Sequence, residues 1–349
     1  MPGVLVGDTV TVSEQKEASQ LYNKGSFGYP LRGGGIELDL TEALYLVEGN
    51  RLLVLEKGEP VSFDELFIKA SMLNDGFDVK YIVYRDMRSR GFVVKIESGA
   101  FDLSVYPRGK TLSNSRPEFM VRAVSERMAL DITDFSAEVL KTNDKGHELL
   151  YGVADEEGDV TYYKMSTRDP KGTVTSGTVE KSIKGVLISD RIFVFVEEDY
   201  HRLKQIGFFG KDIGGVLQLS FVESCYLSEK GILEVKGNDG KIINSDEMKN
   251  IGTKAQSDFH LRIAAYYDLR SRGLVVKTGF KYGTHFRVYE GSPDECHARY
   301  LVHAVPVSNV SMWPEISRTV RLSGGVKKDI LFCRVGYSVE YFEFKWFRP

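Results

Sequence analysis

The sequence predicts a mixed fold of the α/β (α+β) kind, present twice in tandem. The first observation is that YRDMRSRGFVVK at 84–95 recurs as YYDLRSRGLVVK at 266–277. The second is a constant spacing of matched glycines, since Gly25 and Gly207 lie 182 residues apart, as do the glycines inside the two segments. The third is that helical and strand patterns alternate within each half. The period is far too long for a solenoid, so we interpret the chain as two copies of one fold.

Each copy begins with a strand-rich part, which we interpret as a small α/β N-terminal domain. VLVGDTVTV at 4–12 and its counterpart VLISDRIFV at 186–194 alternate in polarity, which predicts a strand in each copy. An amphipathic helix is expected around Tyr45 and around its match, Tyr226. In the first copy, 62–77 is expected to form a second helix, because a serine N-cap is followed three residues later by the glutamate of a capping box.

The trailing part of each copy begins with a helix that ends in arginines and a glycine. Arg88 and Arg270 fall in the last turn, where the helix dipole favours cations. Gly91 and Gly273 then supply the left-handed conformation that often ends a helix. Strands follow, and they predict one mixed central sheet in each copy. The expected strands are FVVKI, FDLSVY, EFMVRAV, ELLYGVAD and VTYYKM in the first copy, and LVVKT, HFRVY, YLVHAV, DILFCRV and VEYFEFKWF in the second.

Composition is that of an ordinary globular protein. The chain has 349 residues, of which 42% are hydrophobic and 27% charged, and its net charge is −3. Its three cysteines, Cys225, Cys296 and Cys333, lack metal-binding spacing and leave one unpaired, which favours a reducing, cytoplasmic compartment. The N-terminus lacks a signal-peptide pattern and no apolar run reaches about 18 residues, so neither secretion nor a membrane span is expected. No metal site or cofactor is predicted.

The two copies differ in the residues that can carry chemistry. The second copy has Tyr289, then His297 eight residues later, and Lys328 further on. Tyr289 matches a tyrosine in the first copy, but His297 falls on Arg116 and Lys328 falls near His147, with a shift of one or two residues left open. The first copy therefore keeps only the tyrosine, Tyr106. We expect this copy to be retained for its role in the architecture.

Tyrosine, histidine and lysine together can cleave RNA without a metal ion. RNA carries its own nucleophile, the 2′-OH beside the scissile phosphate. Cleavage needs a base for that hydroxyl proton, an acid for the leaving 5′-oxygen and a cation for the charge on phosphorus. A phenol with a nearby cation can be the base, imidazole titrates in the range of a general acid, and an ammonium supplies the positive charge.

Two other functions remain open from the residues alone. A metal-dependent DNA nuclease needs clustered carboxylates, and the candidates in the second copy are Asp294 and Glu295, on a loop without a following E-x-K strand. A non-catalytic RNA-binding subunit is what the first copy alone would be. Cleavage that survives a chelator excludes the DNA nuclease, and any cleavage excludes the binding subunit.

Four ordered motifs of the second copy resemble one known family. They are the 266–277 segment continuing into TGFKYG, FRVY at 286–289, HARYLV at 297–302 and RLSGGVKK at 321–328. This pattern is similar to the archaeal tRNA-splicing endonuclease, and the likeness covers each half in turn. It is identified as the duplicated form that works as a homodimer. One departure is Lys327, where the family usually has arginine.

The resemblance implies an enzyme that excises introns from precursor tRNA at bulge–helix–bulge motifs. The products would carry 2′,3′-cyclic phosphate and 5′-OH ends, and the catalytic roles carry over to Tyr289, His297 and Lys328. The family also implies RNA contacts from basic and aromatic side chains that stack on or line the path of an unpaired base. The residues expected to make these contacts are Arg321, Trp346, Lys327, Tyr282 and Lys281.

The resemblance also predicts the domain organisation. The expected parts are an N-terminal domain of repeat 1 (1–77), a degenerate nuclease-like domain (78–168), a linker (169–184), an N-terminal domain of repeat 2 (185–257) and a catalytic nuclease domain (258–349).

An acidic turn in the first copy predicts how two chains assemble. VADEEGDVTYY at 153–163 has no acidic counterpart at RVGYSVEYF, 334–342. In the family, an acidic loop at this place docks into a basic cleft of the opposing subunit. We therefore expect a homodimer held in part by Asp155, Glu156, Glu157 and Asp159.

Overall fold

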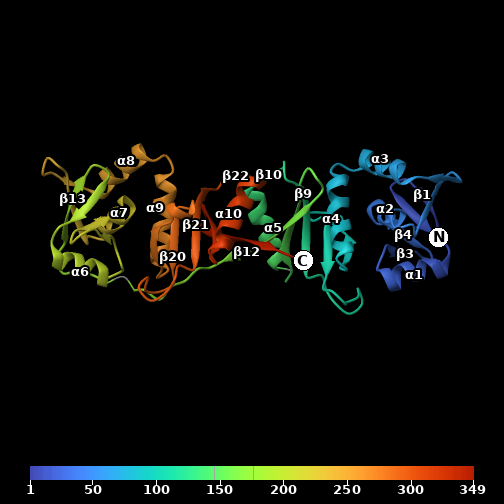
Figure 1. Ribbon diagram of the computed structural model, residues 1–349, viewed down its shortest axis with the longest axis horizontal. Helices are drawn as coiled ribbons and strands as arrows, with labels where there is room; N and C mark the ends of the chain where they lie inside the picture. The colour runs from blue at the N-terminus through green and yellow to red at the C-terminus, as the bar shows by residue number, and fades with distance from the viewer. Residues whose placement is uncertain (145, 176) are drawn as a thin grey trace. The chain divides into compact units, whose positions relative to one another are not determined.

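The protein is described by a computed structural model that covers residues 1–144, 146–175 and 177–349. It forms two compact units, which Figure 1 shows as ribbons. The first unit comprises Met1–Ser166 together with Val310–Ser317 and Lys345–Pro349, and the second comprises Thr167–Asn309 and Arg318–Phe344. Each unit contains helices and mixed sheets in the same order along the chain, so the predicted duplicated α/β fold is confirmed.

The leading part of each unit is a six-stranded sheet with helices. In the first unit the strand order is β3-β4-β2-β1-β5-β6, and in the second it is β15-β16-β14-β13-β17-β18. In each sheet one parallel pair, β1 with β5 or β13 with β17, lies among antiparallel neighbours. The elements of the first unit are β1 (Pro2–Val6), β2 (Thr9–Val12), α1 (Gln15–Gly25), β3 (Tyr29–Pro30), β4 (Ile36–Asp39), α2 (Leu40–Glu48), β5 (Leu53–Glu56), β6 (Glu59–Val61) and α3 (Phe63–Leu73). Those of the second unit are β13 (Ile183–Ile188), β14 (Arg191–Val194), α6 (Glu197–Gln205), β15 (Lys211–Asp212), β16 (Leu217–Leu219), α7 (Phe221–Glu229), β17 (Leu233–Lys236), β18 (Ile242–Ile243) and α8 (Ser245–Ala255).

The prediction of one strand over 4–12 and one over 186–194 is wrong, because each segment is a hairpin. The chain turns at Gly7, which has a φ of 63°, and in the second unit at Ser189, which has a φ of 57°. Alternation of apolar residues continues through such a tight turn, so the pattern alone does not show it. Helices α1 and α6, which follow these hairpins, were not predicted.

The helix predicted from a capping box and the amphipathic helices predicted around Tyr45 and Tyr226 are all present. Helix α3 has Ser62 as its N-cap, and the Glu65 carboxylate accepts the backbone N–H of Ser62 with an N···O distance of 2.8 Å. Helices α2 and α7 contain Tyr45 and Tyr226 and begin with capping boxes of the same kind. Helix α3 ends at Leu73, earlier than the predicted 77, because a second helix begins at Phe77.

The trailing part of each unit is a five-stranded mixed sheet with a helix against it, as Figure 1 shows for α4 and α9. The strand order is β7-β8-β9-β11-β12 in the first unit and β19-β20-β21-β23-β24 in the second. The elements are α4 (Phe77–Ser89), β7 (Val93–Ile96), β8 (Leu103–Tyr106), β9 (Phe119–Ser125), β10 (Ala129–Asp131), α5 (Ile132–Asp144), β11 (Glu148–Ala154) and β12 (Val160–Arg168), then α9 (Phe259–Ser271), β19 (Val275–Thr278), the 3-10 turn η1 (Phe280–Tyr282), β20 (Phe286–Tyr289), β21 (Tyr300–Pro306), β22 (Val310–Met312), α10 (Trp313–Gly325), β23 (Asp329–Val335) and β24 (Val339–Phe347).

Two crossover helices were missing from the prediction. Strands β9 and β11 are parallel, as are β21 and β23, and a parallel pair needs a long crossover connection. Helix α5 makes the first crossover and α10 the second. The strands β10 and β22, which precede these helices, pair with each other. Trp313, the first residue of α10, is buried against Tyr151 and Tyr163 in the first unit, which explains why that unit includes Val310–Ser317.

The start of the expected linker is docked on the second unit. The backbone N–H of Thr173 donates to the carbonyl of Glu290 at 2.8 Å, and that of Val174 donates to Gly273 at 2.9 Å. Gly172 lies so close to the Gly273 carbonyl that a Cβ there would collide with it. This part of the connection is therefore a structural element of the second unit.

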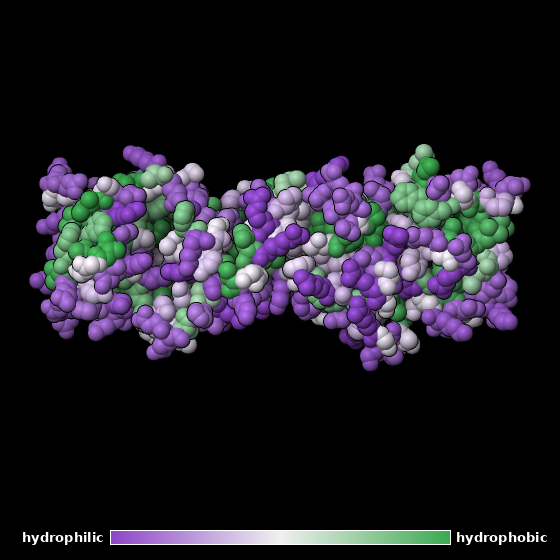
Figure 2. Space-filling model, in the orientation of Figure 1, coloured by the Kyte–Doolittle hydropathy of each residue, from purple (hydrophilic) through white to green (hydrophobic). Residues whose placement is uncertain are grey.

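Hydrophilic residues cover most of the face shown in Figure 2, and hydrophobic residues show between them in small groups. Across the described ranges of the chain, we find no helix that is both long enough and apolar enough to span a bilayer.

Candidate active site

The strand register brings Tyr289, His297 and Lys328 to one edge of the second unit's sheet. Val288 of β20 pairs with Tyr300 of β21, and Tyr300 pairs in parallel with Asp329 of β23. Tyr289 follows Val288, and Lys328 precedes Asp329. Both therefore lie one residue beyond this row of three paired residues, at the same edge of the sheet. Neighbouring strands lie about 4.8 Å apart, so the two backbones are about 10 Å apart with β21 between them.

His297 lies on the segment that leads into this middle strand. The segment turns at Ser292, whose carbonyl accepts the backbone N–H groups of Glu295 at 3.1 Å and Cys296 at 3.0 Å. Ala298, which follows His297, is buried against Tyr289. The imidazole itself is exposed to solvent. His297 therefore lies at the same edge of the sheet, between the strand that ends in the tyrosine and the strand that follows the lysine.

Tyr289 is held in place by packing. Its side chain is 8% exposed and forms a small apolar cluster with Val275 and Ala298, against which Val174 and Phe208 also pack. The docked connection between the two halves thus contributes Val174 to the surroundings of this tyrosine.

Lys328 is positioned by the turn that ends α10. Lys327 adopts the left-handed conformation with a φ of 53°, and the backbone N–H of Lys328 donates to the carbonyl of Ser323 at 3.0 Å. The next residue, Asp329, forms an ion pair with Arg299 at 2.9 Å, so its carboxylate is already paired. The ammonium of Lys328 is left near an aromatic ring, 6.0 Å from the centroid of Tyr282.

Tyr282 lies in a cationic environment. The ammonium of Lys281 is 5.0 Å from its ring centroid. Partial desolvation acts to raise the pKa of the Tyr282 phenol, but a hydrogen bond from Lys281 and the charges of Lys281, Lys328 and Arg287 outweigh it, so the pKa is lowered from its ordinary value. The structure thus brings Tyr282, Lys281 and Lys328, all predicted site residues, into one neighbourhood.

The same registers identify the equivalent positions in the first unit. Val105 pairs with Phe119, and Phe119 pairs in parallel with Glu148. Tyr106, Arg116 and His147 therefore occupy the places of Tyr289, His297 and Lys328, and the register around His147 that the sequence left open has no shift. His147 uses its imidazole locally, since Nδ1 lies 2.8 Å from the carbonyl oxygen of Pro117.

The remaining predicted RNA contacts lie on separate elements. Arg321 is exposed on α10 in the second unit, and Lys327 is exposed in the turn after it. Trp346 is 43% exposed on β24, in the part of that strand that belongs to the first unit. One face of its indole is covered by the guanidinium of Arg348, 4.1 Å from the ring centroid.

The predicted acidic residues form the turn between β11 and β12. The Asp155 carboxylate accepts the backbone N–H groups of Glu157 at 3.0 Å and Asp159 at 2.9 Å, so it shapes the turn. Glu156 forms an ion pair with Arg127. Glu157 and Asp159 are exposed and form no side-chain ion pair among the described residues.

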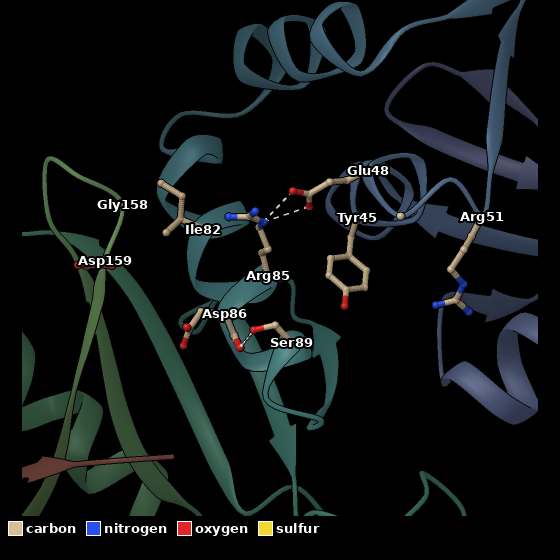
Figure 3. Close-up of a pocket in the computed structure, with 10 residues that line it drawn as sticks. Tyr45, Glu48, Arg51, Ile82, Arg85, Asp86, Ser89, Gly158 and Asp159 are labelled. Atoms are coloured by element: carbon tan, nitrogen blue, oxygen red, sulfur yellow. Dashed lines mark hydrogen bonds and ion pairs between the residues drawn. The ribbon is translucent and has the colours of Figure 1, made fainter.

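A polar cleft of about 490 Å³ lies in the first unit, beside this turn. Figure 3 shows Arg85 of α4 reaching toward Glu48 of α2, with an ion-pair distance of 2.8 Å. Asp86, also on its wall, forms an ion pair with Arg90 at 2.7 Å. Arg85, Glu48 and Asp86 are already paired, and the cleft lies in the copy that lacks a histidine and a lysine equivalent to His297 and Lys328, so we do not assign it to catalysis.

The carboxylates considered for a metal-dependent reaction are exposed. Asp294 and Glu295 lie on the Ser292 turn, where the N–H of Asp294 donates to the Ser292 hydroxyl at 3.2 Å. Among the residues that the structure describes, no cluster of three or more His, Cys, Asp or Glu side chains has an arrangement that could hold a metal ion.

Sequence reasoning missed two residues in this region. Phe280, at the tip of η1, is 88% exposed. Arg287 lies in β20 two residues before Tyr289, with its guanidinium 6.0 Å from the tyrosine ring centroid. The alternation of a strand could have revealed Arg287, because residues two apart share a face. No sequence signal marks Phe280 as exposed.

Comparison with known proteins agrees with this duplicated architecture. The family model of the tRNA intron endonuclease catalytic C-terminal domain matches residues 77–162 and again 259–341. The model of the N-terminal domain of the same family matches residues 1–67 and 183–249. The fold and the paired matches define a duplicated nuclease, and the chain belongs to the tRNA intron endonuclease family. It is an enzyme, an endonuclease.

Similar proteins align along nearly the whole chain. A tRNA-splicing endonuclease of Methanococcoides burtonii is 35% identical over 95% of both chains. One of Methanosarcina mazei is 36% identical over 97% of this chain and 96% of its own. A third, of Halobacterium salinarum, is 33% identical over 95% of this chain and 94% of its own.

Proposed function

We propose that this protein excises introns from precursor tRNA by cleaving at bulge–helix–bulge motifs. Family membership and the names of the similar proteins support tRNA splicing as the process. The observation that carries the reaction is the meeting of Tyr289, His297 and Lys328 at one sheet edge, in the copy where all three occur.

The proposed chemistry is attack by the 2′-OH of the RNA. Tyr289, as phenolate, takes the 2′-OH proton while the 2′-oxygen bonds to phosphorus. The bond from phosphorus to the 5′-oxygen breaks, and His297, as imidazolium, gives that oxygen a proton. Lys328 stabilises the charge that develops on the phosphate. The products are a 2′,3′-cyclic phosphate and a 5′-hydroxyl, with no water consumed.

The electrostatics of the site favour an anionic substrate. Lys281, Lys328 and Arg287 together lower the pKa of Tyr282 against the effect of its partial desolvation, which shows a locally positive potential. Two acids of this region are engaged, because Asp329 is paired with Arg299 and Glu290 accepts the Tyr300 hydroxyl at 2.8 Å. A phosphodiester entering this edge meets cations.

We further propose that Arg321 and Trp346 each stack on an unpaired base, and that Lys327, Lys281 and Tyr282 line the path of the RNA. The planar guanidinium and indole both offer a stacking face. Replacing Arg321 with alanine should weaken binding of a bulge-containing RNA more than binding of a fully paired RNA of the same length. If the change weakens binding of both RNAs equally, or of neither, Arg321 does not stack on the unpaired base.

The experiment that tests the function is incubation of a bulge–helix–bulge RNA with the protein in EDTA, followed by analysis of the new ends. We expect cleavage at both bulges with 2′,3′-cyclic phosphate and 5′-hydroxyl ends. A strict need for Mg²⁺, or 5′-phosphate ends, would contradict the mechanism. The metal-dependent DNA nuclease and the non-catalytic subunit predict no cleavage in this assay.

A further inference from the structure

The strand that ends in Tyr289 also carries an arginine with no assigned role. Side chains alternate along a strand, so Arg287 and Tyr289 of β20 point to the same face of the sheet. The guanidinium carbon of Arg287 is 6.0 Å from the Tyr289 ring centroid. Arg287 is half-buried, whereas Tyr289 is buried. The two side chains are therefore neighbours at the candidate active site, and the arginine is the more exposed of the two.

Among the described residues, Arg287 lacks the kind of counterion that neighbouring arginines have. Arg299 pairs with Asp329 at 2.9 Å, and Arg262 pairs with Asp258 at 3.0 Å. Arg287 forms no ion pair within the described residues, and its Nε is buried without a hydrogen-bond partner. A partly desolvated guanidinium without a partner is costly, and the cost is relieved when an anion binds it.

Two further cations point toward the same place. Lys328 is 6.0 Å and Lys281 is 5.0 Å from the ring centroid of Tyr282, and Arg287 acts on the same phenol electrostatically. Three positive groups around one small region repel one another unless an anion lies among them. A phosphodiester matches this site, because a guanidinium can bind two phosphate oxygens through parallel hydrogen bonds.

The first copy gives an internal comparison. Val93 pairs with Tyr106 as Val275 pairs with Tyr289, so the position of Arg287 corresponds to Ser104. Ser104 is fully buried, so the copy without the His and Lys also lacks this arginine. A serine at this register is compatible with the fold.

We propose that Arg287 binds a non-bridging oxygen of the scissile phosphate and stabilises the charge that develops there during cleavage. The inference rests on the proposed function, because it needs RNA in the site. Tyr289 acts on the 2′-OH beside the scissile phosphate, and Arg287 is its neighbour on the same face. Arg287 is thus a fourth catalytic residue, which acts on phosphorus together with Lys328.

The test is single-turnover cleavage of a bulge–helix–bulge RNA by Arg287→Ser and Arg287→Lys proteins. Loss of one preorganised donor to a developing charge typically costs about 10²-fold or more in rate. We expect a loss of this size for Arg287→Ser and a smaller one for Arg287→Lys, which keeps charge but not the fork. Arg334→Ser is the matched control, because Arg334 pairs with Glu340 at 2.8 Å toward the far end of β23. Circular dichroism and thermal midpoints establish that each variant is folded.

A phosphorothioate substrate separates a phosphate contact from a structural role. Sulfur at the contacted non-bridging oxygen should slow the wild-type protein, and this slowing should shrink in Arg287→Ser because the contact is already lost. Arg287→Ser cleaving within about threefold of the wild-type rate, or an unchanged effect of sulfur, would overturn the proposal. Wild-type protein that fails to cleave the RNA in EDTA would instead remove the proposed function, and this inference with it.

Discussion

At the scale of single residues, the two copies can be compared position by position. The pairing of Val288 with Tyr300 in one unit and Val105 with Phe119 in the other equates His297 with Arg116. The sequence predicted these matches because the motifs are ordered in both halves. It could not predict that Arg287 has no ion-pair partner in the described part of the chain, since ion pairing depends on which strands become neighbours.

Tyr289→Phe tests the proposed base without disturbing its packing. The ring that contacts Val275 and Ala298 is kept and the hydroxyl is removed. We expect a loss of about 10²-fold or more in the rate of the chemical step, the usual scale for a positioned acid or base. The thermal midpoint should stay close to that of the wild type. Tyr106→Phe, the matched change in the first unit, should leave the rate unchanged, and an equal loss in both variants would contradict the assignment.

At the scale of elements, short sequence signals correctly predicted where several helices begin and end. Capping boxes marked α3, and glycines with positive φ ended α4 and α9, at Gly91 with a φ of 87° and Gly273 with a φ of 78°. Helices α5 and α10 were missed because their need arises from the parallel pairing of strands far apart in the sequence. The sequence also did not predict that residues 172–174 dock on the second unit, because a polar, glycine-containing segment is typical of a free linker.

Gly172→Ala tests whether the docked connection supports the site. The added methyl would collide with the carbonyl oxygen of Gly273, so the segment that carries Val174 must shift away from Tyr289. We expect a destabilisation of about 1–3 kcal/mol, the usual cost of overpacking, together with slower RNA cleavage. Denaturant unfolding measures the first effect. Gly324→Ala is the control for stability, because a methyl there meets no atom within 4 Å; equal stability of both variants would show that the connection is loosely held.

A largely but not fully buried histidine, His285, predicts how stability depends on pH. His285 accepts the N–H of Ala304 at Nδ1, at 2.8 Å, and Nε2 faces Asp258 at 3.1 Å. Burial, together with the nearby His303 and Arg262, lowers the pKa of His285 to about 4, and Asp258 only partly opposes this. The unfolded chain therefore takes up the proton first as the pH falls. Stability from this group is complete above the ordinary histidine pKa of about 6.5 and is lost as the pH falls toward 4, by at most about 1.4 kcal/mol per pH unit.

His285→Asn tests this dependence, because the amide oxygen can still accept the Ala304 N–H. The variant should be less stable than the wild type at neutral pH, since it loses the contact with Asp258. Its free energy of unfolding should fall less steeply between pH 6.5 and 4. Denaturant titrations at several pH values give both slopes, and identical slopes would show that His285 does not titrate in this range.

At the scale of the whole molecule, duplication predicted the two-copy architecture, and the family matches repeat in each half. The sequence did not predict that Val310–Ser317 and Lys345–Pro349 group with the first unit. The first segment is held by the burial of Trp313 among first-unit aromatics, and the second by the packing of Phe347 against Phe119, neither of which a local pattern reveals. The boundaries at 77, 168, 184 and 257 remain predictions, which limited proteolysis can test.

Reversing the charge of the acidic turn tests how two chains assemble. We propose a homodimer in which Asp155, Glu156, Glu157 and Asp159 contact the partner's second half. Because Asp155 shapes the turn, the sharper variant changes only Glu157 and Asp159, to lysine. We expect monomers in sedimentation, with cleavage of a two-bulge RNA lost, and weaker wild-type dimers at high salt. Asp239→Lys, in another exposed turn, is the control, and a charge-reversed protein that stays dimeric and active would show that the turn is only solvated.

The most direct test of the central claim, that the second copy carries the chemistry, is a single-turnover comparison of His297→Ala with Arg116→Ala and His147→Ala. A bulge–helix–bulge RNA is used in EDTA, and RNA affinity is measured alongside. We expect His297→Ala to lose about 10²-fold or more in rate, as is usual for a general acid, with RNA binding near that of the wild type. Arg116→Ala and His147→Ala should keep the wild-type rate. Equal losses at His147 and His297, or an undiminished rate in His297→Ala, would show that the second copy does not carry the chemistry in this way.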